Sequence, residues 1–305
     1  MRPRVIALAA GLAAAAMALG AGCGGGNDNG GTSSTANPTA TPGINLQADP
    51  KIVGELPADV KSSGELTVAA DATYPPDEFI AQDGSTVIGM DADMAKAIAQ
   101  LMGLTPKVQN VTFNDIIPGL AANRYDLGMS SFTDTKDREK VVDFVDYLTA
   151  GSAIFVKSGE PKITSLDGLC GHTVAAEKGT TQQDDIASQD EKCKSEGKPG
   201  VTGQILPDQN QVNLAVTSGR ADAAMADSPV AAYIAEKSSG QLEVSGGPFP
   251  PEPYGIAIPK NTGLTQPVFD AVKTLIDNGT YTKILDYWGL QSGAIDQPSI
   301  NKAVS

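Results

Sequence analysis

From residue 64 onward the chain alternates short apolar runs with segments in which apolar side chains recur every three or four positions. In residues 91–102, Met94, Ile98 and Leu101 share one helical face and Gly103 follows as a stop signal, which predicts a helix. The other elements predicted before residue 150 are strands at 66–70, 108–111 and 126–129 and a short helix at 114–121. This alternation of strands and helices predicts an α/β layer with a mostly parallel sheet.

The same pattern restarts after residue 150. The predicted elements are strands at 173–176, 204–206 and 222–225, a helix after the turn at 179–181, a helix at about 211–218 and another beyond Ser228. A chain of 305 residues also has room for two domains of about 150 residues each. We therefore expect two α/β lobes of similar plan.

The N-terminus has the pattern of a secretory signal at residues 1–22. Arg2 and Arg4 precede an Ala-rich apolar run at 5–22, and the small residues before Cys23 resemble a bacterial lipobox. The alternative is a transmembrane anchor, although the run has about the minimum length that spans a bilayer. We expect cleavage before Cys23 and a lipid on that residue, which would hold the exported protein on the outer face of the cell membrane.

Residues 24 to about 50 are mainly Gly, Ser, Thr, Asn and Pro, with almost no apolar side chain. Such a composition does not bury enough apolar surface to offset the entropy lost on ordering. Residues 23–50 are therefore expected to form a flexible tether between the membrane and the globular part of the protein.

Composition and motifs exclude several classes of function. Asp and Glu outnumber Lys and Arg by 36 to 22, which gives a formal net charge of -14 and makes nucleic acid an unexpected partner. The sequence has one histidine, His172, and no phosphate-binding loop of the G-x-x-x-x-G-K-[ST] type, so we expect no metal site and no cofactor. Residues 128–132 lack the second glycine of a nucleophile elbow, so Ser130 is interpreted as a hydrogen-bond donor and not as a catalyst.

Cys170 and Cys193 are left as a pair once Cys23 is assigned to the lipid. An exported compartment permits a disulfide between them, and the polar segment that separates them offers little core for two free thiols, which is the alternative. The bridge would close a loop of about 24 residues and contribute ~3 kcal/mol of stability.

Several ordered motifs carry a family resemblance. They are Ala70–Pro76, Gly89–Ala95, Phe113 with Ile116–Leu120, Asp126 with Ser130, Ser131 and Arg138, then Gly179–Gln182, Gly219–Ala223, Asp227 with Ser228, Tyr254–Ala257, Asp277–Tyr281 and Tyr287–Gly289. In this order they resemble the family 3 extracellular solute-binding proteins, the amino-acid receptors of ABC importers. The resemblance covers about residues 64–290.

The resemblance implies a two-lobed Venus-flytrap, the periplasmic-binding-protein-like II fold, in which each lobe is a mixed, mostly parallel sheet flanked by helices. It implies lobe 1 at 64–150 plus 252–290, lobe 2 at 151–251, a hinge near 149–151 and 246–248, and a C-terminal tail at 291–305. It also implies a monomer without enzymatic activity that closes around a free amino acid and delivers it to ABC permease subunits.

The resemblance further implies which residues hold the backbone of the amino acid. Arg138 has a planar fork suited to the α-carboxylate, and Asp227 supplies a negative charge for the α-ammonium. The remaining matched residues are Ser130, Ser131, Thr133 and Thr181 for further hydrogen bonds, and Tyr74 and Phe113 as aromatics around the ligand side chain. The alternative is a surface arginine, a helix-capping aspartate and core aromatics, each of which would be favoured if it occurred alone.

Carboxylates are expected at the far end of the ligand. Asp71 and Glu177 match positions that face it, one from each lobe, and Asp77 stands where the family usually has an aromatic residue. Such a pocket favours arginine, lysine or ornithine, with glutamine second, because a cationic head relieves repulsion between carboxylates. If Glu177 and Asp77 face solvent or pair with lysines such as Lys178, the pocket is merely polar.

Two other functions are compatible with these sequence features. Cyclohexadienyl dehydratases resemble this fold, and such an enzyme would need a carboxylic acid of raised pKa in the cleft, for which Glu177 is the candidate. A surface sensor that presents its closed form to a signalling receptor would have the same sequence features.

Overall fold

The computed structural model describes residues 40–305. The expected signal peptide, the lipid site at Cys23 and the tether as far as residue 39 lie outside these residues. Between residues 40 and 305 no helix has the length and apolar character needed to cross a bilayer.

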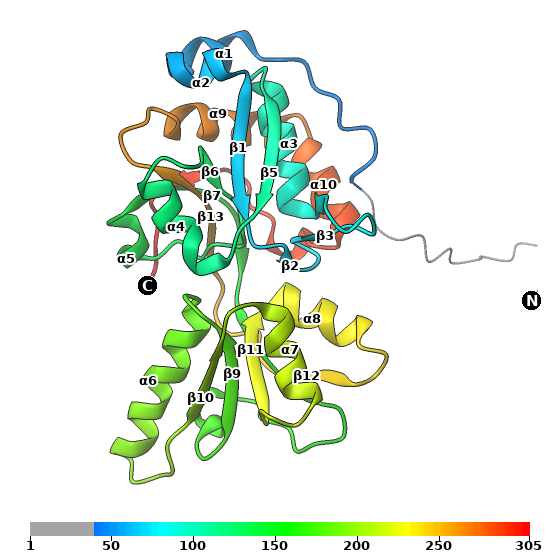
Figure 1. The fold of residues 1–305 in the computed structure, drawn as a ribbon, viewed down its shortest axis with the longest axis vertical. Helices are drawn as coiled ribbons and strands as arrows, with labels where there is room; N and C mark the ends of the chain where they lie inside the picture. Colours follow the sequence, from blue (N-terminus) through cyan, green and yellow to red (C-terminus); the bar gives the residue numbers. More distant parts are fainter. Residues whose placement is uncertain (1–39) are drawn as a thin grey trace, which may run out of the picture. The chain divides into compact units, whose positions relative to one another are not determined.

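A six-stranded sheet, in the order β14-β7-β13-β6-β1-β5, is the centre of the first lobe (Figure 1). Its strands are β1 (Glu65–Ala70), β5 (Thr105–Asn110), β6 (Leu127–Gly128), β7 (Val142–Ala150), β13 (Glu252–Pro259) and β14 (Ser299–Ile300). The helices of this lobe are α1 (Pro50–Glu55), α2 (Ala58–Ser63), α3 (Met90–Leu101), α4 (Phe113–Ala121), α5 (Lys136–Glu139), α9 (Thr265–Asp277), α10 (Thr280–Trp288) and the 3-10 turn η2 (Gln291–Gly293). A small sheet of β2 (Thr73–Tyr74), β3 (Glu78–Ile80) and β4 (Val87–Ile88) lies beside them.

A five-stranded sheet, in the order β10-β9-β11-β8-β12, is the centre of the second lobe. Its strands are β8 (Ser152–Lys157), β9 (Thr173–Glu177), β10 (Thr202–Leu206), β11 (Ala223–Asp227) and β12 (Leu242–Gly246). Its helices are α6 (Thr181–Ser195), α7 (Gln209–Thr217), α8 (Ser228–Lys237) and the 3-10 turn η1 (Leu166–Leu169). In both sheets the early strands pair in parallel and the strands next to the crossings pair antiparallel, so the predicted two-lobed α/β fold is confirmed.

Both faces of the first sheet are buried, which explains the apolar character of β1. Leu66 and Val68 pack into the core that contains the apolar faces of α3, α9 and α10, whereas Ala69 belongs to the core on the other face with Ile116 and Leu120 of α4. This packing fixes the carboxyl end of β1, from which the chain continues directly into the segment that carries Asp71 and Tyr74.

The chain passes between the sheets twice. It leaves the first sheet at Ala150 and enters the second at Ser152, and it leaves the second at Gly246 and returns at Glu252. The two connections touch at Gly151, where an added Cβ would lie 2.0 Å from the carbonyl oxygen of Phe249. Only glycine permits this approach of the two backbones.

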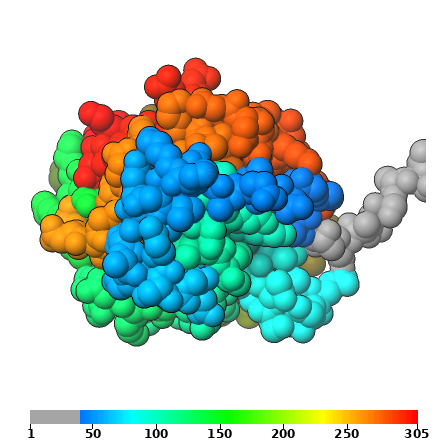
Figure 2. Space-filling view, turned by 90° about the horizontal axis from the view of Figure 1, so that it is seen from above, coloured from blue at the N-terminus to red at the C-terminus, as the bar shows by residue number. Residues whose placement is uncertain are grey.

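Two terminal segments differ from the sequence prediction. Part of the expected tether is packed against the first lobe: the backbone N–H of Thr41 donates to Asp93 over 2.6 Å, and Ile44 is buried in the core. Figure 2 shows this N-terminal segment (blue) against the chain around α9 (orange), where Lys51 pairs with Asp270 over 2.6 Å. At the other end, β14 pairs with β7, so the expected tail at 291–305 supplies a strand.

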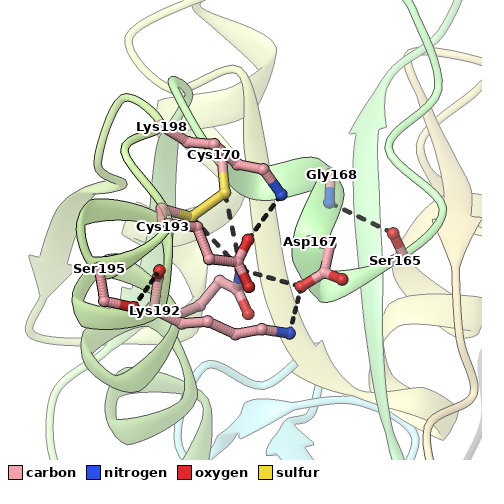
Figure 3. Close-up of polar contacts among 10 residues, drawn as sticks. Ser165, Asp167, Gly168, Cys170, Lys192, Cys193, Ser195 and Lys198 are labelled. Carbon is pink, nitrogen blue, oxygen red and sulfur yellow. Dashed lines mark hydrogen bonds and ion pairs between the residues drawn. A yellow bond between two sulfur atoms is a disulfide. The ribbon is translucent and has the colours of Figure 1, made fainter.

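The predicted disulfide between Cys170 and Cys193 is present, with a Cα–Cα distance of 5.7 Å (Figure 3). It ties the end of η1 to α6. Lys192 also reaches Asp167 of η1 over 2.6 Å, so a covalent bond and an exposed ion pair join the same two elements.

Candidate functional site

A pocket of about 770 Å³ is lined by residues of both lobes. The first lobe contributes Thr133 and Arg138, which follow β6, and the second contributes Thr181 at the start of α6 and Asp227 at the end of β11. The structure therefore brings together the four residues expected around the backbone of an amino acid. Asp137, Asp184, Asp185 and Glu252 also line this pocket.

The guanidinium of Arg138 is half-buried and held on several sides. Nη1 donates to the carbonyl oxygen of Thr133 over 2.7 Å, and Nη2 donates to the carbonyl oxygen of Gly179 over 2.9 Å. Its Cζ atom lies 5.5 Å from the ring centroid of Phe113 and 5.4 Å from that of Phe132, which is within cation-π range. The fork is thus a fixed positive charge in the pocket.

Asp227 provides the opposite charge from the second lobe. It is 9% exposed, and its Oδ1 accepts a hydrogen bond of 2.8 Å from Nε2 of Gln182. Burial raises the pKa of Asp227 to about 6, although the hydrogen bond from Gln182 and the charge of Arg138 act against this increase. The carboxylate is therefore mostly ionised at neutral pH. Gln182 was not among the residues expected in the site. Its hydrogen bond positions Asp227, and its place next to Thr181 in the first turn of α6 is the sequence signal for that role.

Three buried aromatic rings form a cluster beside Arg138, although none of them lines the pocket that contains it. Phe113 stacks on Phe132 with a centroid distance of 4.5 Å and meets Tyr74 at 5.9 Å. Phe132 was not among the expected site residues, although it directly follows Ser131 and precedes Thr133, both of which were. The two phenylalanine rings of this cluster are the ones that contact the Arg138 guanidinium.

Asp71 of the first lobe and Glu177 of the second are buried carboxyl groups, and neither of them lines the pocket that contains Arg138. Asp71 accepts hydrogen bonds of 2.8 Å from the Thr73 hydroxyl and from the backbone N–H of Phe113. Glu177 is 1% exposed, and within residues 40–305 neither of its carboxyl oxygens has a hydrogen-bond partner. Burial, followed by the charge of Asp71, raises the pKa of Glu177 to about 9. Burial and the neighbouring Glu177 likewise raise the pKa of Tyr74.

Ser130, Ser131 and Asp77 form a buried hydrogen-bonded cluster with Glu78. The Ser131 hydroxyl donates to Asp77 over 2.9 Å, and the Ser130 hydroxyl donates to Glu78 over 2.9 Å. All four side chains are buried, and none of them lines the pocket that contains Arg138. Asp77 lies beside Asp91, whose charge adds to burial in raising the pKa of Asp77. Asp77 therefore does not join Glu177 at the expected far end of the ligand. Glu177 itself is buried and does not face solvent.

Comparisons with known proteins agree with this geometry. The sequence profile of the bacterial extracellular solute-binding proteins, family 3, matches residues 66–291. The arginine-binding protein ArgT of Corynebacterium glutamicum is 35% identical over 254 residues, which are 83% of this chain and 83% of that protein.

Solved structures give the same likeness. An ancestral arginine-binding protein bound to arginine has a TM-score of 0.68 and 34% identity, covering 74% of this chain and 98% of that chain. The ancestral amino acid-binding protein AncCDT-1, a precursor of cyclohexadienyl dehydratase, has a TM-score of 0.65 and 35% identity, covering 75% of this chain and 97% of that chain.

Proposed function

The chain belongs to the bacterial extracellular solute-binding proteins of family 3, and on this basis we propose that it is the receptor of an ABC importer for a cationic amino acid, with arginine as the preferred ligand. It binds the free amino acid between its lobes and delivers it to the permease subunits in the membrane. The protein itself catalyses no reaction.

The observation that carries this proposal is the placement of Arg138 and Asp227. They bring opposite charges from the two lobes to one pocket. An amino acid is a zwitterion, so its α-carboxylate suits the fork of Arg138 and its α-ammonium suits Asp227. Thr133 and Thr181 lie next to these two groups and supply further polar contacts. Binding to both lobes favours the arrangement in which they are close together.

The preference for arginine rests on the buried acids. A guanidinium offers five N–H donors in one plane. Among the residues that the structure describes, the two buried oxygens of Glu177 have no hydrogen-bond partner, and they lie next to Asp71 and the Tyr74 hydroxyl. A glutamate ligand would bring a further negative charge to this place. ArgT and the ancestral protein, both named for arginine binding, support the same choice.

The entrance of the pocket favours cations as well. Asp184, Asp185 and Glu252 line it, and burial together with the charge of Glu252 raises the pKa of Asp185 to about 6. Clustered negative charge around a cleft attracts positively charged solutes and raises their rate of encounter.

The remaining parts of the proposal concern the whole protein. The lipid on Cys23 anchors a monomer to the outer face of the cell membrane. Lobe 1 comprises 64–150 with 252–290, and lobe 2 comprises 151–251, supported by the passage of the chain between the sheets at these places. Permease and ATPase genes beside this gene would favour transport over signalling.

One observation favours a second candidate function. AncCDT-1 is described as a precursor of cyclohexadienyl dehydratase, and Glu177 has the raised pKa that a general acid needs. This candidate predicts loss of water from a cyclohexadienyl substrate and loss of that activity in Glu177→Gln. Binding of arginine without turnover of such a substrate would leave the receptor as the function.

A ligand screen tests the proposed function. Thermal shifts with the twenty amino acids and ornithine should be largest for the cationic ones, because a ligand that binds only the folded state stabilises it. Calorimetry with arginine, lysine, ornithine, glutamine and glutamate then ranks the affinities. Tightest binding of glutamate would refute the acidic pocket.

A further inference from the structure

Residues 299–305, which we call the C-terminal strap, lie beyond the segment 66–291 that the family profile matches. The strap begins as β14, where Ser299 and Ile300 pair with Asp146 and Val145 of β7. It is therefore anchored in the first sheet.

The strap continues beside the edge of that sheet. The backbone N–H of Phe144 donates to Oδ1 of Asn301 over 2.7 Å, and the backbone N–H of Asn301 donates to the carbonyl oxygen of Phe144 over 3.2 Å. The Ser299 hydroxyl also donates to the buried Asp146 over 2.6 Å. These bonds fix the direction in which the next residues leave β7.

The last residues of the strap reach the loop that carries Arg138. The N–H of Lys302 donates to Asp134 over 2.9 Å, and the N–H of Ala303 donates to the Glu139 carboxylate over 3.1 Å. The N–H of Lys136 in turn donates to the carbonyl oxygen of Ser305 over 3.0 Å. The strap thus bonds to the loop on both sides of Arg138.

The strap also borders the ligand pocket. Val304 and Ser305 line the same pocket as Arg138, Thr181 and Asp227. The helix α5 is a single turn of four residues without a fully buried side chain, and Arg138 is the residue through which it packs on Phe113 and Phe132. The bonds to the strap are its long-range polar contacts at Lys136 and Glu139.

We propose that the C-terminal strap is a positioning element for the binding site: it holds the loop of Arg138 in the geometry that grips the α-carboxylate and forms one wall of the pocket entrance. This inference rests on the proposed function and adds to it a segment outside the family profile. Loss of the strap lets the loop leave its binding geometry. If the loop then occupies that geometry for a third to a tenth of the time, the Kd for arginine rises about threefold to tenfold.

The experiment compares the full chain with a variant that ends at Ile300. Hydrogen exchange at the amides of residues 136–141 should be faster in the shortened chain, with or without arginine. The Kd for arginine should rise about threefold to tenfold, because a smaller fraction of the free protein is ready to bind. In an Arg138→Lys background the same truncation should change the Kd less than twofold, because residues that act together are not additive.

Point variants keep the test decisive if the shortened chain fails to fold. Glu139→Ala removes the acceptor for Ala303 and should reproduce part of both effects. Glu139→Gln keeps an acceptor oxygen, so its exchange rates and Kd should stay near those of the unaltered protein. Lys302→Ala is the matched control, because the bond at Lys302 is made by the backbone. The proposed role of the strap would be wrong if the shortened chain showed unchanged hydrogen exchange at residues 136–141 or bound arginine as tightly as the full chain or more tightly. It would also be wrong if the truncation raised the Kd to the full extent in the Arg138→Lys background. Failure of the full chain to bind any amino acid would refute the proposed function, while exchange would still decide whether the strap holds the loop.

Discussion

Arg138 donates a hydrogen bond of 2.9 Å from Nη2 to the carbonyl oxygen of Gly179, and this bond joins the loop after β6 to the turn before α6. The donor belongs to the first lobe and the acceptor to the second. The group that we expect to hold the ligand carboxylate is therefore also a contact between lobes.

Replacement of Arg138 by alanine should weaken arginine binding at least thirtyfold. Truncation of one partner of a desolvated charge pair costs about 2–5 kcal/mol, and the contact to Gly179 is lost as well. Isothermal titration calorimetry measures the change. Arg124→Ala, which alters an exposed arginine over Tyr125, is the control and should bind as the unaltered protein does. Binding by Arg138→Ala within threefold of normal would mean that the carboxylate site is misplaced.

Arginine binding should release a proton from Glu177. Its pKa of about 9 keeps this carboxyl group protonated at neutral pH, and a guanidinium favours the ionised form. Affinity should therefore rise with pH between 7 and 9, by at most about tenfold per pH unit for one proton. Calorimetry in buffers of different ionisation enthalpy counts the protons. The Glu177→Gln variant should lose this pH dependence, and an equal slope in both proteins would contradict the assignment.

The free energy of unfolding should decrease as pH rises from 5 to 9. Glu177 has a folded-state pKa of about 9 and Asp134 one of about 8, both above the unfolded values of about 4. Between these values the folded state binds more protons than the unfolded state, so stability falls by up to about 1.4 kcal/mol per pH unit per group. Urea denaturation at several pH values measures this slope.

Variants and the acid side provide the checks on that slope. Glu177→Gln and Asp134→Asn should each make the slope between pH 5 and 9 shallower. On the acid side Asp83, whose pKa is lowered to about 2 by bonds from Thr86 and Ser85, adds stability that is present above its unfolded pKa and lost as pH falls through 2. Stability that rises steadily from pH 5 to 9 would refute the raised pKa values.

Reduction of the disulfide between Cys170 and Cys193 should lower stability by ~3 kcal/mol, because the reduced unfolded chain gains the freedom of the loop that the bond closes. The measurement is denaturation with and without a reductant, with the double variant Cys170→Ser, Cys193→Ser as the reference. Arginine affinity should stay within twofold, since the bond lies at the far end of α6 from Thr181. A large loss of affinity would show that the disulfide also orders the site.

Local patterns predicted the elements whose apolar spacing is regular. The helix expected at 91–102 is α3 at Met90–Leu101, because its apolar face packs into the core as the spacing requires. The helix expected from Asn114 instead begins at Phe113, with Thr112 at the N-cap. The reason is a tertiary contact, since the backbone N–H of Phe113 is bound by the distant Asp71 carboxylate.

The placement of Arg138 and Asp227 in one pocket was predictable, because their charges are opposite to those of the two charged groups of an amino acid. The placement of Ser131 was not predictable, because its N–H and hydroxyl bind Asp91 and Asp77, 40 and 54 positions away. A local pattern carries no information about such pairs. The contacts of the strap were not predictable for the same reason. The partners of Lys302 and Ala303 lie more than 160 residues earlier in the chain.

The place of β13 between β7 and β6 affects the order in which the chain can fold as it is made. Every strand of the second sheet lies within residues 152–246, so that sheet can be complete while the first still lacks its central strand. Until residue 259 is available, β6 and β7 have open edges, which are prone to wrong pairing. The lobe that starts first is therefore finished last, and we expect its unpaired edges to need protection during synthesis and export.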